Sequence, residues 1–235
     1  MAGVVLLSGG LDSTVAMALF LEQNTLDLAL TFDYGQRARE RELQAAASLA
    51  ECYGINHKVI KLPFLEEETH TALVDSTQSL PSLKPTELDE VQGRAAVSAH
   101  NVWVPNRNGL FINIAAVFAE NLPEPSYIIA GFNREEAGTF PDNSPAFIDT
   151  INASLAYSTS KNIILFSPTS LLDKTEIVKE GLRLHIPWQF LWSCYAGREL
   201  WCGACESCQR LKRALSLNGQ EDLIKKLFAQ QSELD

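Results

Sequence analysis

The sequence predicts an α/β fold built on a doubly wound, mostly parallel sheet, with a small helical subdomain at the C-terminus. Three observations lead to this prediction. Short apolar runs alternate with segments of helical periodicity, which is typical of βαβ units. Polar motifs follow several of these runs, where the carboxyl ends of parallel strands bind ligands. Four of the five cysteines lie between residues 194 and 208, near the end of the 235-residue chain.

The first half of the chain reads as three strands separated by two helices. We expect strands at 4–7, 26–32 and 58–62, and helices at 15–21 and 37–53, the second of which ends at Gly54. Segment 63–101 is rich in Ser, Thr and Pro and is predicted to be an irregular insertion with one or two helices. Its acidic residues 66–68 are interpreted as a solvated helix face.

The second half continues the alternation of helices and strands. A helix is expected at 109–120, a strand at 127–130, a helix at 145–157 and a strand at 163–166, followed by a helix that begins near Asp173. We therefore predict one α/β domain at 1–184 and a C-terminal subdomain at 185–235, with helical apolar sequence at 211–228. The aromatic stretch 188–192 is expected to pack in the core.

Residues 8–14, Ser-Gly-Gly-Leu-Asp-Ser-Thr, join the first strand to the first helix. Gly9 and Gly10 let the backbone approach a ligand closely and adopt positive φ. The unpaired N–H groups at the helix start favour an anion, and the hydroxyl side chains add donors. A glycine turn with a simple N-cap is the alternative, but the whole motif after a buried strand indicates phosphate binding. Domain 1–184 is therefore predicted to bind a nucleotide.

The charge balance limits the possible partners. The chain has 19 Lys and Arg against 29 Asp and Glu, a formal net charge of −10, and 46% of its residues are hydrophobic. This acidic balance argues against broad binding to nucleic acid or to anionic membranes. The N-terminal residues show no basic segment before a long apolar run. We therefore expect no signal peptide, no membrane span and a cytoplasmic protein.

Cys194, Cys202, Cys205 and Cys208 are separated by seven, two and two residues. Two overlapping Cys-x-x-Cys steps favour a tetrahedral all-thiolate zinc site. An iron–sulfur cluster also uses four thiolates, and four buried cysteines without metal are the plainer alternative. Because four protein ligands leave no open position, we expect a structural metal, whose loss lowers stability without changing chemistry at the phosphate loop. The fifth cysteine, Cys52, lies outside this cluster and is expected in the core.

Taken in order, these motifs resemble those of the 7-cyano-7-deazaguanine synthases of queuosine precursor synthesis, which are PP-loop ATP pyrophosphatases. The resemblance covers nearly the whole chain. It is carried by residues 8–14, 33–37, 104–108, 131–133 with 141–142, 174–177, and 193–194 with the three later cysteines.

The resemblance implies an ATP-dependent carbon–nitrogen ligase. Members of this family adenylate the carboxylate of 7-carboxy-7-deazaguanine, let ammonia displace AMP to give an amide, and use a second ATP to convert the amide into a nitrile. The expected partners are the deazapurine, ATP and ammonia, with structural zinc and with magnesium held by Asp12 beside the phosphates. No direct contact with nucleic acid is expected. The resemblance and the apolar stretch 188–192 are compatible with a homodimer.

The resemblance also assigns residues to roles. The catalytic candidates are Asp12, Ser13, Arg107 and Lys174. Arg107 and Lys174 would offset negative charge on the phosphates. The alternatives are a surface salt bridge for Arg107 and a solvated side chain for Lys174. The nucleotide is expected at Leu7, Ser8, Gly9, Gly10, Leu11, Asp12, Ser13, Thr14, Val15, Ala16, Met17, Asp33, Tyr34 and Gln36. The deazapurine is expected at Arg107, Asn108, Asn133, Glu136, Phe140 and Asp142.

One loop departs from the family pattern, which has Asp and then Tyr-Pro-Asp-Cys-Arg where this chain has Glu136 and residues 140–144, Phe-Pro-Asp-Asn-Ser. A Cys and an Arg are thus absent at Asn143 and Ser144, on the loop expected to hold the deazapurine. Two alternative reactions follow. The enzyme stops at the amide, or it joins the deazaguanine carboxylate to another amine, including one on a protein. A nucleotide-binding sensor without turnover is the non-enzyme alternative.

Overall fold

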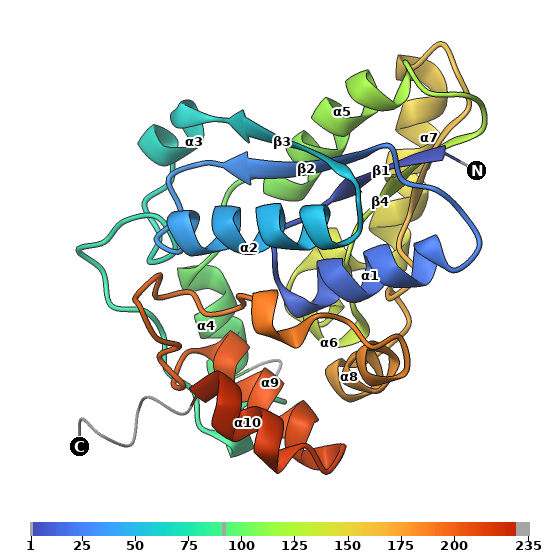
Figure 1. Cartoon of the computed structure of the whole chain (residues 1–235). Helices are drawn as coiled ribbons and strands as arrows, with labels where there is room; N and C mark the ends of the chain where they lie inside the picture. The colour runs from blue at the N-terminus through green and yellow to red at the C-terminus, as the bar shows by residue number, and fades with distance from the viewer. Residues whose placement is uncertain (1, 91–92, 229–235) are drawn as a thin grey trace.

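The computed structural model describes residues 2–90 and 93–228 and has a five-stranded parallel sheet at its centre (Figure 1). The strands are β1 (Ala2–Leu6), β2 (Leu28–Asp33), β3 (Asn56–Lys61), β4 (Ser126–Ile129) and β5 (Ile163–Phe166). They are hydrogen-bonded in the order β3-β2-β1-β4-β5 and every pair is parallel. The chain therefore reverses its direction of travel across the sheet between β1 and β4, which is where doubly wound sheets bind ligands. The predicted fold class is confirmed.

Helices cover both faces of the sheet (Figure 1). On one face lie α1 (Leu11–Leu21), α2 (Arg39–Cys52) and α8 (Lys174–Arg183), and on the other lie α5 (Arg107–Ala119) and α7 (Pro145–Ser158). Successive side chains of a strand point to opposite faces. Val4 therefore packs in the core under α5 and α7, whereas Val5 packs in the core under α1 and α2, and both are fully buried.

In the part that the structure describes, the insertion at 63–101 contains two α-helices, in agreement with the one or two helices predicted. It contains α3 (Pro63–Glu68), a 3₁₀ turn η1 (Pro85–Glu87) and α4 (Arg94–Asn101), and the acidic residues 66–68 are exposed as expected. The insertion docks on the C-terminal segment, where Ser98 Oγ donates to Glu206 Oε2 at 2.6 Å. Arg210 donates to the Leu88 carbonyl at 2.9 Å, so two buried polar side chains hold the insertion in place. Residues 91–92 of the predicted insertion lie outside the described residues.

The C-terminal segment consists of a 3₁₀ turn η3 (Trp188–Phe190), α9 (Glu206–Leu217) and α10 (Glu221–Phe228). Its apolar side chains, including Leu211 and Leu215, belong to the same core cluster as Val15 of α1. The aromatic stretch 188–192 packs against that cluster, as predicted. Residues 229–235 of the predicted subdomain lie outside the described residues. Within the described part, none of the helices combines the length and apolarity that a membrane crossing requires.

Cys52 is a correction to the sequence prediction, because its side chain is exposed. It is the last residue of α2, whose buried positions are Ala45, Ala46, Leu49 and Ala50. At 3.6 residues per turn, position 52 falls at the edge of that buried stripe and not at its centre. The position of Cys52 on the helix therefore decides its exposure, and its apolar character does not.

Candidate active site

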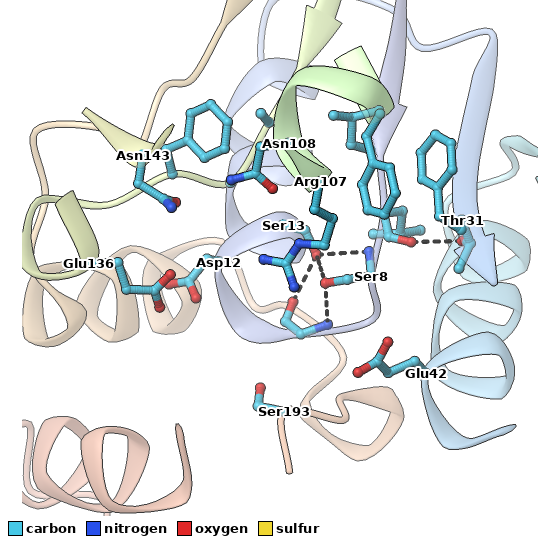
Figure 2. A pocket seen from close by; sticks show the side chains of 18 of the residues that line it. Ser8, Asp12, Ser13, Thr31, Glu42, Arg107, Asn108, Glu136, Asn143 and Ser193 are labelled. Atoms are coloured by element: carbon cyan, nitrogen blue, oxygen red, sulfur yellow. Dashed lines mark hydrogen bonds between the residues drawn. The ribbon is translucent and has the colours of Figure 1, made fainter. Parts of the chain in front are cut away.

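The phosphate loop leaves the end of β1 and turns into α1 at the centre of the sheet. Gly9 adopts φ +81°, and a Cβ there would lie 2.6 Å from Ala45 Cβ, so α2 packs directly beneath the loop. The loop is cross-linked by its own hydroxyls: Ser8 N–H donates to Ser13 Oγ at 3.3 Å, and the Ser8 and Ser13 hydroxyls lie 3.1 Å apart (Figure 2). Because α2 and these bonds hold the loop, its geometry is set before a ligand arrives.

Not every residue of the predicted nucleotide motif lines the cavity above the loop. Thr14 is fully buried, and its hydroxyl donates to the Gly10 carbonyl at 2.8 Å, so it stabilises the first turn of α1. The next three residues are fully buried in the core between α1 and the sheet: Val15, Ala16 and Met17. The structure therefore assigns residues 14–17 to packing, whereas the residues around 8–13 carry the polar surface of the loop.

A cavity of about 240 Å³ lies over the loop, far more space than the roughly 30 Å³ that one water molecule occupies. Residues following β1, β2 and β4 meet there, as the switch point of the sheet requires. The predicted site residues that line the cavity are Leu7, Ser8, Gly10, Asp12, Ser13, Tyr34, Arg107, Asn108, Glu136 and Phe140.

Lys174 lies beside the cavity, where it is paired with two carboxylates. It begins α8, its side chain is 7% exposed, and Nζ lies 2.5 Å from Asp12 Oδ2 and 3.4 Å from Glu136 Oε1. Burial lowers the pKa of Lys174, but the two carboxylates outweigh burial and raise it, so the side chain is an ammonium. Burial raises the pKa of Glu136, but Lys174, the Asn133 hydrogen bond and Arg210 together outweigh burial and lower it. The solvated alternative for Lys174 is wrong.

Arg107 is the second cation of the site, and it has no carboxylate partner. The helix α5 begins at Arg107 and not at residue 109, because Asn106 takes a left-handed conformation (φ 53°) at its N-cap. The guanidinium donates to the Tyr34 hydroxyl at 3.2 Å and lies above the phosphate loop (Figure 2). In residues 2–90 and 93–228 no carboxylate lies within 4.0 Å of it, so the alternative of a surface salt bridge is not found. An unpaired cation facing a cavity is suited to bind an anion.

Four predicted site residues lie behind the cavity wall. Gln36 is buried, accepts from Tyr34 N–H at 3.0 Å and donates to Glu42 Oε2 at 2.9 Å. Asp33 Oδ1 accepts from Gly35 N–H at 3.4 Å, and the Asp142 carbonyl accepts from the Asn108 amide at 3.3 Å. Asn133 is fully buried, and its Oδ1 accepts from Glu136 N–H at 2.9 Å. Gln36, Asp142 and Asn133 thus hold cavity-lining neighbours in position, whereas Asp33 holds the turn at Gly35.

The upper wall of the cavity in Figure 2 is apolar and aromatic. Phe111 stacks on Phe32 with ring centroids 3.9 Å apart, and Phe140 stacks on Trp103 at 6.1 Å. Tyr34 completes this wall and tilts against Phe111. Stacked rings present a rigid, flat surface. The cavity therefore combines a polar phosphate loop on one side with a surface suited to a planar ring on the other.

The loop that departs from the family pattern places its two altered residues differently. Asn143 is buried and lines the cavity. Ser144 is the N-cap of α7: its Oγ accepts from Phe147 N–H at 3.2 Å and donates to the Pro141 carbonyl at 2.7 Å. The expectation that both positions face the substrate is therefore wrong for Ser144. A short hydroxyl caps a helix well, because its oxygen reaches the free N–H two or three residues on.

The four clustered cysteines converge as predicted. Their Sγ atoms all lie within 4.8 Å of one another, which makes them a group that can hold a metal ion. Cys202 N–H points at Cys194 Sγ at 3.2 Å, and Cys205 N–H points at Cys202 Sγ at 3.3 Å. Backbone donors of this kind stabilise thiolates.

The cysteine cluster is not separate from the phosphate loop, contrary to expectation. Trp192 N–H donates to the Gly9 carbonyl at 2.9 Å, and its ring N–H donates to the Cys194 carbonyl at 2.9 Å. A Cβ on Gly197 would collide with the Arg37 carbonyl, so the loop between the cysteines packs on the start of α2 as well. Loss of the metal should therefore also disturb the loop that binds phosphate.

Several cavity residues were not identified from the sequence. They come from β2 and α2, from the 73–111 region, from the segment around the first clustered cysteine and from α9: Thr31, Glu42, Leu73, Val102, Phe111, Trp192, Ser193, Tyr195 and Ser207. Glu42 carries a raised pKa because burial opposes its charge. Ser193 belongs to a motif that carries the family resemblance but was given no ligand role, and the others lie outside those motifs. Their contribution depends on how distant segments dock.

The fold and the site define a nucleotide-binding α/β enzyme with a glycine phosphate loop and an attached four-cysteine cluster that can hold a metal ion. The chain belongs to the family described as Queuosine biosynthesis protein QueC, whose sequence model matches residues 2–219. It is 53% identical over 219 residues to the 7-cyano-7-deazaguanine synthase of Pelotomaculum thermopropionicum, covering 93% of this chain and 98% of that one. It is also 53% identical to the synthase of Desulforamulus reducens (95% and 99% covered) and 46% identical to that of Methanosarcina barkeri (94% and 96% covered).

Gly9 and Gly10 are expected to differ in what they do. The backbone at Gly9 has a positive φ, which alanine adopts at a cost, and a Cβ there would collide with Ala45. Gly9→Ala should therefore lower the free energy of unfolding by about 2 kcal/mol or more. A Cβ on Gly10 meets only Ser8 Oγ, Ser193 Oγ and the Trp192 carbonyl at 3.4–3.8 Å, which are ordinary contacts at the cavity. Gly10→Ala should therefore keep wild-type stability and lose affinity for pyrophosphate.

Urea unfolding and titration calorimetry with pyrophosphate measure the two effects. Equal loss of stability in both variants, or unchanged pyrophosphate binding by Gly10→Ala, contradicts this division of roles.

Proposed function

We propose that this chain is a 7-cyano-7-deazaguanine synthase. A carboxylate oxygen of 7-carboxy-7-deazaguanine attacks the α-phosphorus of ATP, and pyrophosphate leaves. Ammonia then attacks the acyl carbon, and loss of AMP and a proton leaves the amide. The amide oxygen attacks a second ATP, and loss of AMP and the two amide protons leaves the nitrile. Each turnover thus consumes two ATP and releases two AMP and two pyrophosphate.

The observation that carries this proposal is that one cavity has a polar side suited to phosphates and an aromatic side suited to a planar base. On one side are the loop hydroxyls of Ser8 and Ser13 and the unpaired Arg107, which suit phosphates. On the other is the wall containing Phe111 and Phe140, which suits a planar base. An adenylation reaction needs both, because the carboxylate on the planar ring must reach the α-phosphorus.

The residues that lower the barrier to adenylation are those that stabilise the charge on the leaving pyrophosphate. Negative charge grows on the leaving pyrophosphate as its bond to the α-phosphorus breaks, and fixed cations near that charge lower the barrier. Lys174 is held in place by Asp12 and Glu136, and Arg107 by Tyr34, so neither has to reorganise. Ser13 lines the same cavity and contributes a hydroxyl beside the loop. These are the residues we assign to transition-state stabilisation.

Asp12 is suited to hold magnesium beside the phosphates. It lines the cavity, and its Oδ1 has no hydrogen-bond partner among the described residues. A buried carboxylate oxygen without a donor is a fitting ligand for a hard cation. Bound magnesium would supply further charge neutralisation on ATP.

The metal we propose for the cysteine cluster is zinc. In a tetrahedral site with Zn–S bonds of about 2.3 Å, the sulfur atoms lie ~3.8 Å apart. The observed Cys202–Cys208 separation of 3.9 Å, with all four sulfurs within 4.8 Å, matches a single ion. An iron–sulfur cluster places several atoms between the thiolates and needs a wider spacing. All four positions are filled by protein, so the zinc is structural.

The altered loop does not redirect the reaction in this proposal. The case for a different acceptor rested on a lost cation at position 144, and Ser144 is engaged in capping α7. Asn143 remains in the cavity, where its amide offers donors and an acceptor to a base. We therefore expect the nitrile and not the amide or a conjugate as the product.

Incubation of the protein with ATP, ammonia and 7-carboxy-7-deazaguanine should yield 7-cyano-7-deazaguanine and AMP. Mass spectrometry of the products measures this, and Ser13→Ala, which loses a loop hydroxyl, should make little AMP. Amide accumulation without nitrile, or a product only with another amine, would favour the alternative reactions. ATP binding with no AMP formation would indicate a sensor.

Lys174→Met should reduce AMP formation about a hundredfold or more, the loss typical of removing one transition-state donor. The substitution also leaves Asp12 and Glu136 facing each other without their cation, which raises both pKa values. Raised pKa values in the folded state cost stability once pH exceeds the unperturbed values of 3.8 and 4.5. The stability difference from wild type should therefore be small near pH 4 and grow toward pH 7.

Thermal unfolding between pH 4 and 8, with a coupled assay for AMP, tests both effects. Lys179→Met is the matched control, because Lys179 lies on the same helix and is exposed. A stability difference that does not vary with pH would argue against the buried charge cluster.

Elemental analysis should find one zinc per chain. Cys205→Ser should lose zinc and stability, and it should also bind ATP more weakly than wild type, because Trp192 joins the metal site to Gly9. Iron in place of zinc would contradict the assignment. Full ATP affinity in a folded, metal-free variant would contradict the connection between the two sites.

A further inference from the structure

Ser193 is a cavity residue to which the reaction as described gives no role. It lines the same cavity as Ser8 and Gly10, although it lies far from them in the sequence. In Figure 2 it lies beneath the turn of the phosphate loop, on the side away from Arg107. Its Oγ accepts from Leu11 N–H at 3.3 Å, and a Cβ on Gly10 would lie 3.5 Å from it.

The backbone on both sides of Ser193 is anchored. Before it, Trp192 N–H donates to the Gly9 carbonyl, and the Trp192 ring packs against Trp201 with centroids 5.4 Å apart. The Arg41 guanidinium lies 5.4 Å from the Trp192 ring centroid and stacks over it. After it comes Cys194, the first residue of the cysteine cluster. The position of the Ser193 hydroxyl is therefore set by the metal site and by α2 together.

Ser193 supplies the side-chain hydrogen-bond acceptor that the start of α1 lacks. The N-cap of α1 is Gly10, which has no side chain to accept from the first N–H groups of the helix. Ser193 Oγ takes that place from a distant segment by accepting from Leu11 N–H. A hydroxyl that accepts a hydrogen bond keeps its own O–H for donation. No described residue accepts from Ser193 Oγ, so this donor is free at the cavity.

We propose that Ser193 belongs to the phosphate site and donates a hydrogen bond to the pyrophosphate portion of ATP. The ligand chemistry follows from the neighbours, because the Ser8 hydroxyl and the Gly10 backbone converge on the same space. The inference rests on the proposed function and extends it: the metal site positions a phosphate ligand and does not only stabilise the fold. Ser193 itself thus connects the cysteine cluster to the site of ATP cleavage.

The test compares metal-loaded wild type with Ser193→Ala, Ser193→Thr and Ser82→Ala. Ser82 is the matched control, because its hydroxyl donates to the Ala204 carbonyl in the same cysteine loop at 3.3 Å and does not line the cavity. Calorimetry with inorganic pyrophosphate and, separately, with AMP probes the two parts of the nucleotide. Zinc content and thermal unfolding are measured on every protein.

Ser193→Ala should bind pyrophosphate about tenfold to a hundredfold more weakly, the effect of losing one hydrogen bond to a charged group. Its zinc content and its affinity for AMP should remain at the wild-type level. Ser193→Thr retains the hydroxyl and should restore most of the pyrophosphate affinity, and Ser82→Ala should behave as wild type.

Unchanged pyrophosphate binding by Ser193→Ala would overturn the inference. So would equal weakening of pyrophosphate and AMP, or weakening that accompanies zinc loss, because each indicates a structural role only. If wild type itself binds neither pyrophosphate nor ATP, the proposed function fails together with the inference. If wild type binds both and Ser193→Ala is unaffected, the inference alone fails.

Discussion

The N–H groups at the start of α1 must stay free of backbone partners and yet be held rigidly, and much of the structure serves that requirement. α2 packs beneath Gly9 so closely that a methyl group would not fit. Behind the loop, a Cβ on Gly131 would lie 2.4 Å from Ser13 N, so the chain leaving β4 packs directly against α1. A loop confined on these sides loses little conformational freedom when an anion binds, which favours affinity.

The two cations of the site are arranged in different ways. Lys174 is compensated by Asp12 and Glu136, so the cluster is stable while no phosphate is bound. Arg107 lacks a carboxylate partner among the described residues and contacts both the hydroxyl and the ring of Tyr34. An anion entering the cavity therefore meets one cation that is already neutralised and one that is not. We therefore expect the phosphates to make their first contact at Arg107, where the attraction is not offset.

The cysteine cluster acts on the active site through short covalent and hydrogen-bonded paths. Residues 192–194 connect the loop at Gly9 and Leu11 to the first thiolate. On its other side the cluster begins α9, and Glu206 and Arg210 of that helix hold the insertion through Ser98 and Leu88. The C-terminal segment thus supports both the phosphate loop and the insertion, and a metal bound there would order both through these contacts.

The sequence by itself determined the local elements and the motifs that they carry. The alternation of strands and helices, the loop at 8–14 and the four cysteines follow from periodicity and spacing within short segments. Only the tertiary structure decided which side chains meet. Ser144 caps α7, and Thr14 turns its hydroxyl back to the Gly10 carbonyl. Cys52 lies outside the core, Lys174 is paired and Ser193 completes the start of α1. The reason is physical: a local pattern specifies which face of an element is buried, whereas a contact between residues 11 and 193 depends on how whole segments dock.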